Sequence, residues 1–120
     1  MTKLRVTNVT RGTLLADHAD IADTGRKSRV GLRKHATLAP GEGLWIGVCE
    51  AVHTFGMKFA IDVVFLDRQK RVVKTRTNML RRRIAVSLRA DSVLELPAGR
   101  ILDTSTQIGD QLEFEKFADD

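Results

Sequence analysis

Apolar residues in the first part of the chain fall into short alternations. Leu4 and Val6 alternate with polar residues, and further short apolar pieces occupy Thr13–Ala16 and Asp20–Asp23. Period-two alternation is typical of strands with one face against a core and the other in water. We therefore expect short, half-buried strands in this region.

The strongest strand signal is the run from Ile61 to Asp67, where β-branched and aromatic residues are nearly continuous. Such a run is typical of a strand buried on both faces, and we expect it in the middle of a sheet. Asp67 to Lys70 is predicted to form a hairpin turn. The other predicted strands are Leu44–Val48, Arg71–Thr77, Val93–Leu96 and Gln111–Phe117.

Glycine and proline divide these strands, with turns predicted at Ala39–Gly43, Pro97–Gly99 and Gly109–Asp110. Gly25–His35 is poor in large apolar residues and is predicted to hold a short basic helix, and Arg100–Ile108 a helical turn. Seven or more closely spaced strands predict a mainly β fold, an antiparallel β-sandwich or barrel with one or two short helical segments. The 120 residues fit a single domain, 1–120.

Charge is unevenly distributed. The net charge is +5, yet nine Lys and Arg residues and no acid lie between Asp67 and Asp91, so the rest of the chain sums to −4. The single cysteine, Cys49, cannot form an internal disulfide, and the sequence shows no signal peptide and no run of 18 apolar residues. We expect a cytoplasmic monomer without a cofactor.

Three blocks in order resemble domain-of-unknown-function family 192: Ser28–Leu32 with Leu38–Leu44, then Cys49–Asp67, then Val93–Gly99 with Gly109–Asp110. The resemblance covers about residues 14–114 and implies a compact, jelly-roll-like β-sandwich, but no activity. The commonest family pattern carries a Trp-Met pair where this chain has His53-Thr54, and this chain resembles the His-Thr-Phe-Gly-Met branch.

Four residues around this block form the first candidate site. Asp62 and Glu95 interrupt apolar strands, and a buried carboxylate requires partners. One interpretation is a polar ligand pocket that they line with His53 and Thr54. The other is an ion pair with an arginine such as Arg29 or Arg100, or simple exposure.

Cys49 and His53 suggest a second site. Their spacing of four could place a thiolate and an imidazole on one metal ion, or pair a nucleophile with its base near Asp62. No paired CxxC or HxxxH motif accompanies them. The alternative is that Cys49 is a small buried hydrophobe.

The basic segment 68–89 is the third candidate, as a surface for nucleic acid or acidic lipid. Its alternative is a solvated strand face and loop. The residues concerned are Arg71, Lys74, Arg76, Arg81, Arg82 and Arg83.

No complete catalytic motif is present, so the sequence favours a non-catalytic module that binds a small ligand or a protein partner through its loops. The two alternatives are an enzyme or metal-dependent protein centred on Cys49, His53 and Asp62, and an anion-binding protein.

Overall fold

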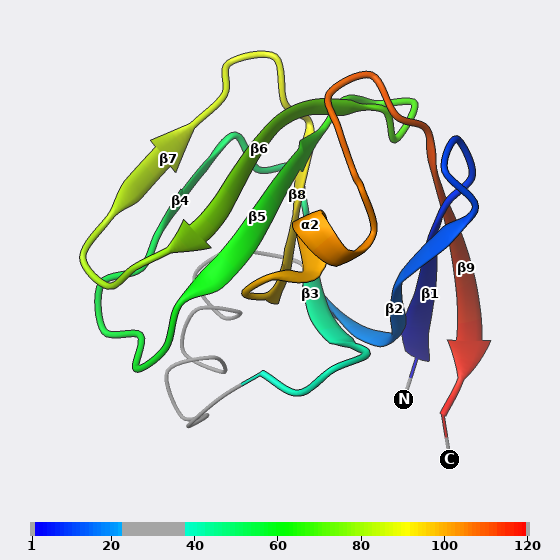
Figure 1. Ribbon diagram of the computed structural model, residues 1–120, viewed down its shortest axis with the longest axis horizontal. Coiled ribbons are helices and arrows are strands. Elements are labelled where there is room, and N and C mark those ends of the chain that lie inside the picture. Colours follow the sequence, from blue (N-terminus) through cyan, green and yellow to red (C-terminus); the bar gives the residue numbers. More distant parts are fainter. Residues whose placement is uncertain (1, 23–37, 120) are drawn as a thin grey trace.

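The computed structural model describes residues 2–22 and 38–119, and strands dominate this part of the chain (Figure 1). A short helix, α2 (Arg100–Asp103), follows the eighth strand. The strands are β1 (Thr2–Asn8), β2 (Thr13–Ala22), β3 (Glu42–Gly47), β4 (Ala51–His53), β5 (Ile61–Leu66), β6 (Val72–Met79), β7 (Ile84–Val86), β8 (Ser92–Pro97) and β9 (Leu112–Ala118).

Seven strands form one sheet in the order β6-β5-β8-β3-β2-β1-β9, and β4 pairs with β7 in a separate two-stranded sheet. One pair departs from the predicted antiparallel arrangement, because β2 and β3 run parallel. Parallel neighbours need a crossover of a dozen or more residues. The chain between Ala22 and Glu42 is long enough to supply one.

The large sheet curls until its two edge strands approach each other at one end. There an isolated bridge joins Arg71, before β6, to Gln111, before β9. Two hydrogen bonds flank the bridge: Val72 N donates to Asp110 O at 2.9 Å, and Leu112 N donates to Lys70 O at 3.0 Å. The sheet is therefore curved and pinched at one end, but it is not a closed barrel.

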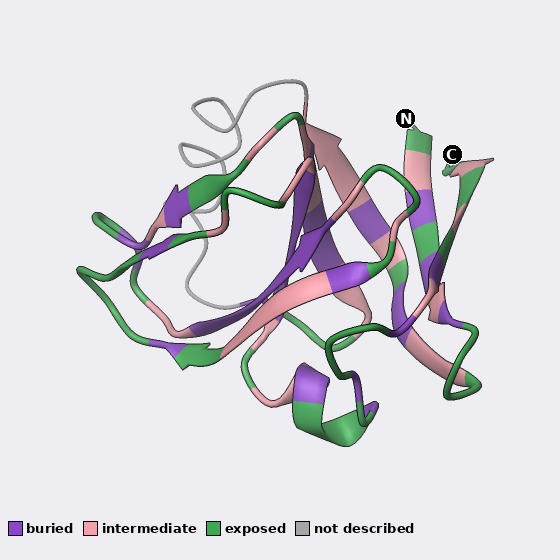
Figure 2. Cartoon of the chain, turned by 90° about the horizontal axis from the view of Figure 1, so that it is seen from above, coloured by how far each residue is buried: buried purple, intermediate pink, exposed green. Residues whose placement is uncertain are grey.

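Strand alternation divides the apolar side chains between the two faces of the large sheet. In β5, Val64 and Leu66 join one core cluster, which includes Leu4, Leu15 and Leu96. Ile61, Val63 and Phe65 join the other, which β4 and β7 cover with Val52 and Ala85. Figure 2 shows β5 and β8 almost wholly buried.

A buried polar cluster fixes the end of β1 to the loop before β9. Asp110 Oδ2 accepts hydrogen bonds from Asn8 Nδ2 and Arg11 Nε, both at 3.0 Å, and from Gln107 N at 2.9 Å. Burial by itself raises the pKa of Asp110, but the bonds from Arg11, Asn8 and Gln107 outweigh it and hold that pKa below its ordinary value.

The mainly β prediction is confirmed, and so are most strands to within a few residues. The two pieces predicted in Thr13–Asp23 are one strand, β2, and β5 lies next to the edge strand β6 rather than in the middle. The helical turn at Arg100 is confirmed as α2, whereas the predicted helix Gly25–His35 lies outside the described residues. Across the described ranges, no helix is long and apolar enough to span a membrane.

Candidate functional site

Asp62 is a fully buried residue of β5, and its carboxylate is occupied by backbone donors. Oδ1 accepts from Asn78 N at 2.8 Å, and Oδ2 accepts from Gly99 N at 3.1 Å and Ile101 N at 2.8 Å. The side chain thus ties the end of β6 and the start of α2 to the sheet. Its predicted alternative partner, Arg100, donates instead to the carbonyl oxygens of Leu14 and Leu15.

Glu95 is also fully buried, but on the other face of the sheet. It pairs across the strands with Val63 of β5 and Leu44 of β3, whereas Asp62 pairs with Leu96. Directly opposite residues of antiparallel strands share a face, so the two acids point in opposite directions. The structure therefore does not bring Asp62 and Glu95 into one pocket.

Thr54, just after β4, is buried and holds the loop between β6 and β7. Its hydroxyl donates to Leu80 O at 2.5 Å and accepts from Arg83 N at 2.8 Å. Its backbone N–H donates to Arg83 O at 2.9 Å. One threonine thereby fixes both ends of the Arg81-Arg82-Arg83 loop.

His53 lies on the outer face of the two-stranded sheet, directly opposite Ile84. Its Nδ1 accepts a hydrogen bond from Phe55 N at 3.3 Å, and the two rings are 5.5 Å apart. Its neighbour Val52 points the other way, into the core. His53 is half-buried on this face.

Cys49 is half-buried and packs against the core cluster that contains Phe65, and its Sγ–H donates to Ala51 O at 3.1 Å. Asp62 points toward the opposite cluster, so the large sheet lies between the two side chains. Within residues 2–22 and 38–119, no group of three or more His, Cys, Asp or Glu side chains could hold a metal ion.

The basic residues predicted as one surface separate into groups. Lys74 and Arg76 pair with Phe65 and Val63 and so face the side covered by β4 and β7. Lys74 Nζ donates to Val86 O at 2.7 Å. Arg71 lies at the far end of β6, beside β9.

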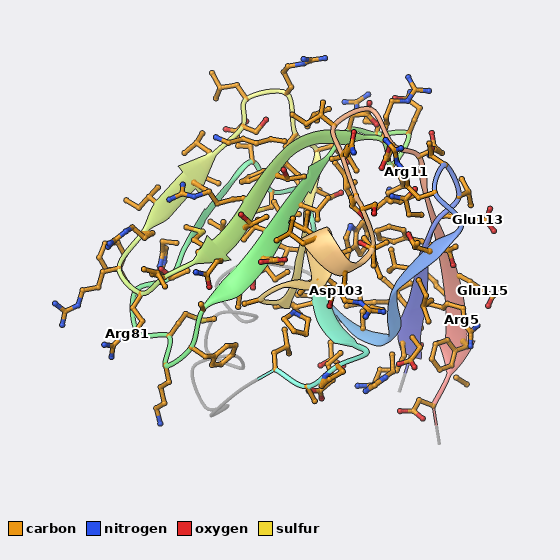
Figure 3. All side chains as sticks on the ribbon, viewed as in Figure 1. Arg5, Arg11, Arg81, Asp103, Glu113 and Glu115 are labelled. Atoms are coloured by element: carbon orange, nitrogen blue, oxygen red, sulfur yellow. The ribbon has the colours of Figure 1, made fainter. Side chains whose placement is uncertain are left out.

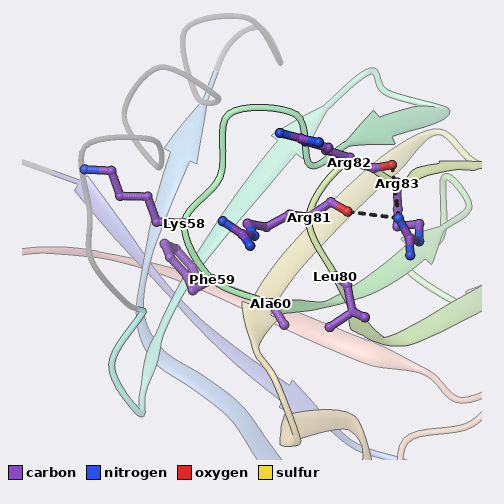
Figure 4. A pocket seen from close by; sticks show the side chains of 7 residues that line it. All are labelled: Lys58, Phe59, Ala60, Leu80, Arg81, Arg82 and Arg83. Carbon is purple, nitrogen blue, oxygen red and sulfur yellow. Dashed lines mark hydrogen bonds between the residues drawn. The ribbon is translucent and has the colours of Figure 1, made fainter.

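Arg81, Arg82 and Arg83 line a pocket of about 660 Å³ together with Lys58, Phe59, Ala60 and Leu80 (Figure 4). Arg81 extends from its loop toward the side lined by Lys58 and Phe59. None of the described lining residues is acidic. The pocket is therefore a cationic recess with an aromatic and an aliphatic wall.

Arg83 has a different role from its two neighbours. Its Nη1 donates to Arg81 O at 3.1 Å and to Arg82 O at 3.4 Å (Figure 4). These bonds close the loop on itself, and Arg82 adopts a positive φ of 59° within it. Together with Thr54, Arg83 holds the backbone of Arg81 and Arg82 in place.

Lys58 and Phe59 are lining residues that the sequence reasoning did not select. They follow Thr54 in a turn in which Met57 N donates to Thr54 O and Gly56 has a positive φ of 81°. The one signal in the sequence is that both residues lie within the family block Cys49–Asp67. The pocket itself depends on β4–β7 pairing, which the sequence does not reveal.

Two solved structures match this chain over most of its length and over most of their own. A protein of unknown function from Novosphingobium aromaticivorans DSM 12444 has a TM-score of 0.78 at 18% identity, over 92% of this chain and 83% of its own. A candidate transcription regulator from Sinorhizobium meliloti 1021 has a TM-score of 0.81 at 20% identity, over 95% and 94%. These likenesses show the fold alone.

A third structure, a candidate exported protein from Burkholderia pseudomallei K96243, has a TM-score of 0.53 at 14% identity; the match covers 96% of this chain and 25% of that one. No curated protein matches the sequence. Residues 6–114 match DUF192, described as an uncharacterized ACR. Since this match spans most of the chain, the protein belongs to domain-of-unknown-function family 192.

Proposed function

We propose that this domain is a non-catalytic binding module that takes a small organic phosphate in the pocket between residues 58–60 and 80–83. The observation that carries the proposal is a recess of about 660 Å³ lined by four basic side chains. Small-molecule sites commonly have volumes of about 300–1,000 Å³ and combine apolar walls with a few placed polar groups.

The charges of the pocket favour a phosphate group over a neutral ligand. Arginine offers a planar fork of donors that matches phosphate oxygens, and lysine acts as a point charge. Arg81, Arg82 and Lys58 supply both kinds of donor. Phe59 and Leu80 offer apolar contact to the organic part of the ligand.

The loop geometry supports a binding role because it reduces the entropy lost on binding. Thr54 and Arg83 hold the loop through hydrogen bonds to its own backbone. A preorganised site retains more of its interaction energy as affinity. Thr54 is therefore a positioning residue in this proposal.

The test is calorimetric titration with three probes at low salt: phenyl phosphate, inorganic phosphate and benzyl alcohol. Phenyl phosphate should bind most tightly, inorganic phosphate more weakly, and neutral benzyl alcohol undetectably. The variant with Arg81→Ser and Arg82→Ser should lose at least about tenfold in affinity, since a charge-assisted hydrogen bond contributes about 1.5–3 kcal/mol. Arg68→Ser is the matched control, because Arg68 is a highly exposed arginine outside the pocket.

Thr54 gives a second arm to this experiment. Thr54→Val keeps the shape but removes the hydroxyl that joins Leu80 and Arg83, so it should weaken phenyl phosphate binding. Thr54→Ser retains the hydroxyl and should restore it. If no probe binds at low salt, or if the double arginine variant binds as the wild type does, the proposal fails.

We also propose that the domain acts in the cytoplasm, because small organic phosphates are abundant there. The single cysteine of the chain is in accord with a reducing compartment. Cell fractionation of the full-length protein tests this location directly.

A further inference from the structure

Strand β7 exposes its large side chains and buries its small one. Ile84 and Val86 are 60% and 42% exposed, whereas Ala85 between them is 3% exposed and faces the core. A half-buried strand normally turns its large apolar residues inward. The reversed pattern indicates that the outer face of β7 contacts something other than water.

This apolar face continues beyond the strand in both directions. Leu88, 82% exposed, lies in the turn that directly follows β7, where Ala90 N donates to Ser87 O at 3.1 Å. At the other end, His53 lies opposite Ile84, and the ring of Phe55, 45% exposed, lies against His53. We call the surface formed by Phe55, Ile84, Val86 and Leu88 the β7 face.

Basic residues surround the β7 face. Arg83 precedes Ile84 in the loop that also carries Arg81 and Arg82, and exposed Arg89 follows Leu88. Lys74 Nζ lies at the strand edge, bonded to Val86 O. Glu50, whose carbonyl oxygen accepts from Ser87 N, is an acid beside this surface, so the face is predominantly but not wholly cationic.

Among the described residues, charge differs between the β7 side and the β9 side of the molecule. Exposed Glu113 and Glu115 lie on β9, at the opposite side of the molecule from Arg81 (Figure 3). Basic residues accompany them, because Lys116 follows Glu115 on β9 and Arg5 of β1 lies directly opposite Glu115. The β9 side therefore carries charges of both signs, and an anionic surface would attract the β7 side more strongly. A second copy docked face to face would instead bring two arginine-rich rims together, which like charges disfavour.

The small size of the β7 face favours an anionic bilayer over an anionic protein as its partner. Two strands of three residues form a platform about 10 Å long and about 10 Å wide, from the usual rise and spacing of strands. A stable protein interface covers about 800 Å² on each partner. A bilayer needs no such area, because separate apolar side chains enter the interface one by one while arginines meet the lipid phosphates.

We propose that the β7 face docks onto an anionic lipid bilayer, with Ile84, Val86 and Leu88 in the interfacial region and the flanking arginines at the lipid phosphates. This surface does not depend on the ligand of the pocket, although Arg81 to Arg83 border both. The domain would thereby be a reversible, peripheral membrane-binding module.

The first experiment is flotation of the purified full chain with two kinds of vesicle. One contains phosphatidylcholine alone, and the other equal parts of phosphatidylcholine and phosphatidylserine. The protein should float with the anionic vesicles at low salt and remain behind with the neutral ones. Raising the salt should weaken the binding, because the attraction of exposed charges is screened.

Matched variants separate insertion from simple adsorption. The variant with Ile84→Ser and Leu88→Ser should bind anionic vesicles at least about tenfold more weakly, as apolar contact is lost. The variant with Leu102→Ser and Ile108→Ser removes equally exposed residues elsewhere and should bind as the wild type does. Arg89→Ser should cost about fivefold, the effect of one basic residue near an anionic surface.

Fluorescence supplies an independent readout of the same contact. Leu88→Trp should show a blue shift on addition of anionic vesicles, after subtraction of the wild-type signal from Trp45, the chain's single tryptophan. Leu102→Trp should show none. Since neither residue lines the pocket, these results stand apart from the phenyl phosphate titration.

Four results would overturn the proposal. The first is that the protein does not float with anionic vesicles at low salt, and the second is that the Ile84→Ser, Leu88→Ser variant binds these vesicles as its control does. The third is that the wild-type protein is a dimer and this variant is a monomer. The fourth is that the protein binds a soluble poly-glutamate peptide as tightly as it binds anionic vesicles. The third would assign the β7 face to a second copy, and the fourth to an acidic protein.

Discussion

Replacing Asp62 by alanine should destabilise the fold strongly, because this carboxylate acts as a structural acceptor. It accepts three backbone N–H groups, and the Ile101 bond is fully buried. Hydrogen bonds to a charged group contribute about 1.5–3 kcal/mol each, and an abandoned buried donor costs about 1–3 kcal/mol. Water can reach the partly buried N–H groups of Asn78 and Gly99, so we expect the free energy of unfolding to fall by about 3–5 kcal/mol.

This loss is a large share of the stability of a domain of this size, which is about 5–15 kcal/mol. Urea unfolding, followed by Trp45 fluorescence and far-UV circular dichroism, measures it. With a urea dependence of about 1–3 kcal/mol per molar, the midpoint should fall by about 2 M. Asp62→Asn should lie between wild type and Asp62→Ala, since one amide oxygen still accepts while the NH2 group faces donors.

Asp103 on α2 provides the matched control. Its side chain is exposed, and it belongs to the same helix that Asp62 anchors (Figure 3). Asp103→Ala should change the free energy of unfolding by no more than about 0.5 kcal/mol. The reasoning is refuted if the midpoints of Asp62→Ala and Asp103→Ala coincide. If Asp62→Ala instead weakened only ligand binding, the carboxylate would belong to a functional site.

Two further predictions concern buried contacts. Asp110→Asn should lower the free energy of unfolding near neutral pH. The folded pKa of Asp110 lies below its unfolded value, so the stabilisation by the carboxylate is present above about pH 5 and is lost as pH falls through the folded pKa. Unfolding of both proteins at decreasing pH should therefore show the difference in their free energies of unfolding disappear. A gap that widened in acid would contradict this sign. Gly43→Ala should lower the free energy of unfolding by about 1–3 kcal/mol through overpacking, because the new Cβ would lie 3.0 Å from Glu95 O and 3.2 Å from Leu96 Cδ2. An unchanged melting temperature would contradict this, since it would mean that β3 and β8 move apart without cost.

Short-range patterns determined much of the fold. The continuous apolar run of β5, the alternation of β1 and the turn at Asp67 follow from local chemistry. In that turn Asp67 Oδ1 accepts from Gln69 N and Arg71 N, both at 2.9 Å, which fixes the hairpin without help from distant residues. Such features can be predicted because their causes lie within a few positions along the chain.

Only the tertiary structure determines which of the predicted site residues lie together. Asp62 and Glu95 would share a face if β5 and β8 were shifted by one residue, since a one-residue slip turns every side chain of a strand over. The observed register, Val63 opposite Glu95, separates them. Only the packing of neighbouring strands against the core selects this register, and no local pattern in either strand encodes it.

The arginine pocket and the β7 face depend on still longer contacts. Strands β4 and β7 are three residues each, too short to give a periodic signal, and they pair across about thirty residues of chain. That pairing places Thr54 against Arg83 and turns Ile84 outward. The sequence by itself determined a β domain with a basic segment, whereas long-range pairing decided which basic residues line a recess and which apolar ones meet the outside.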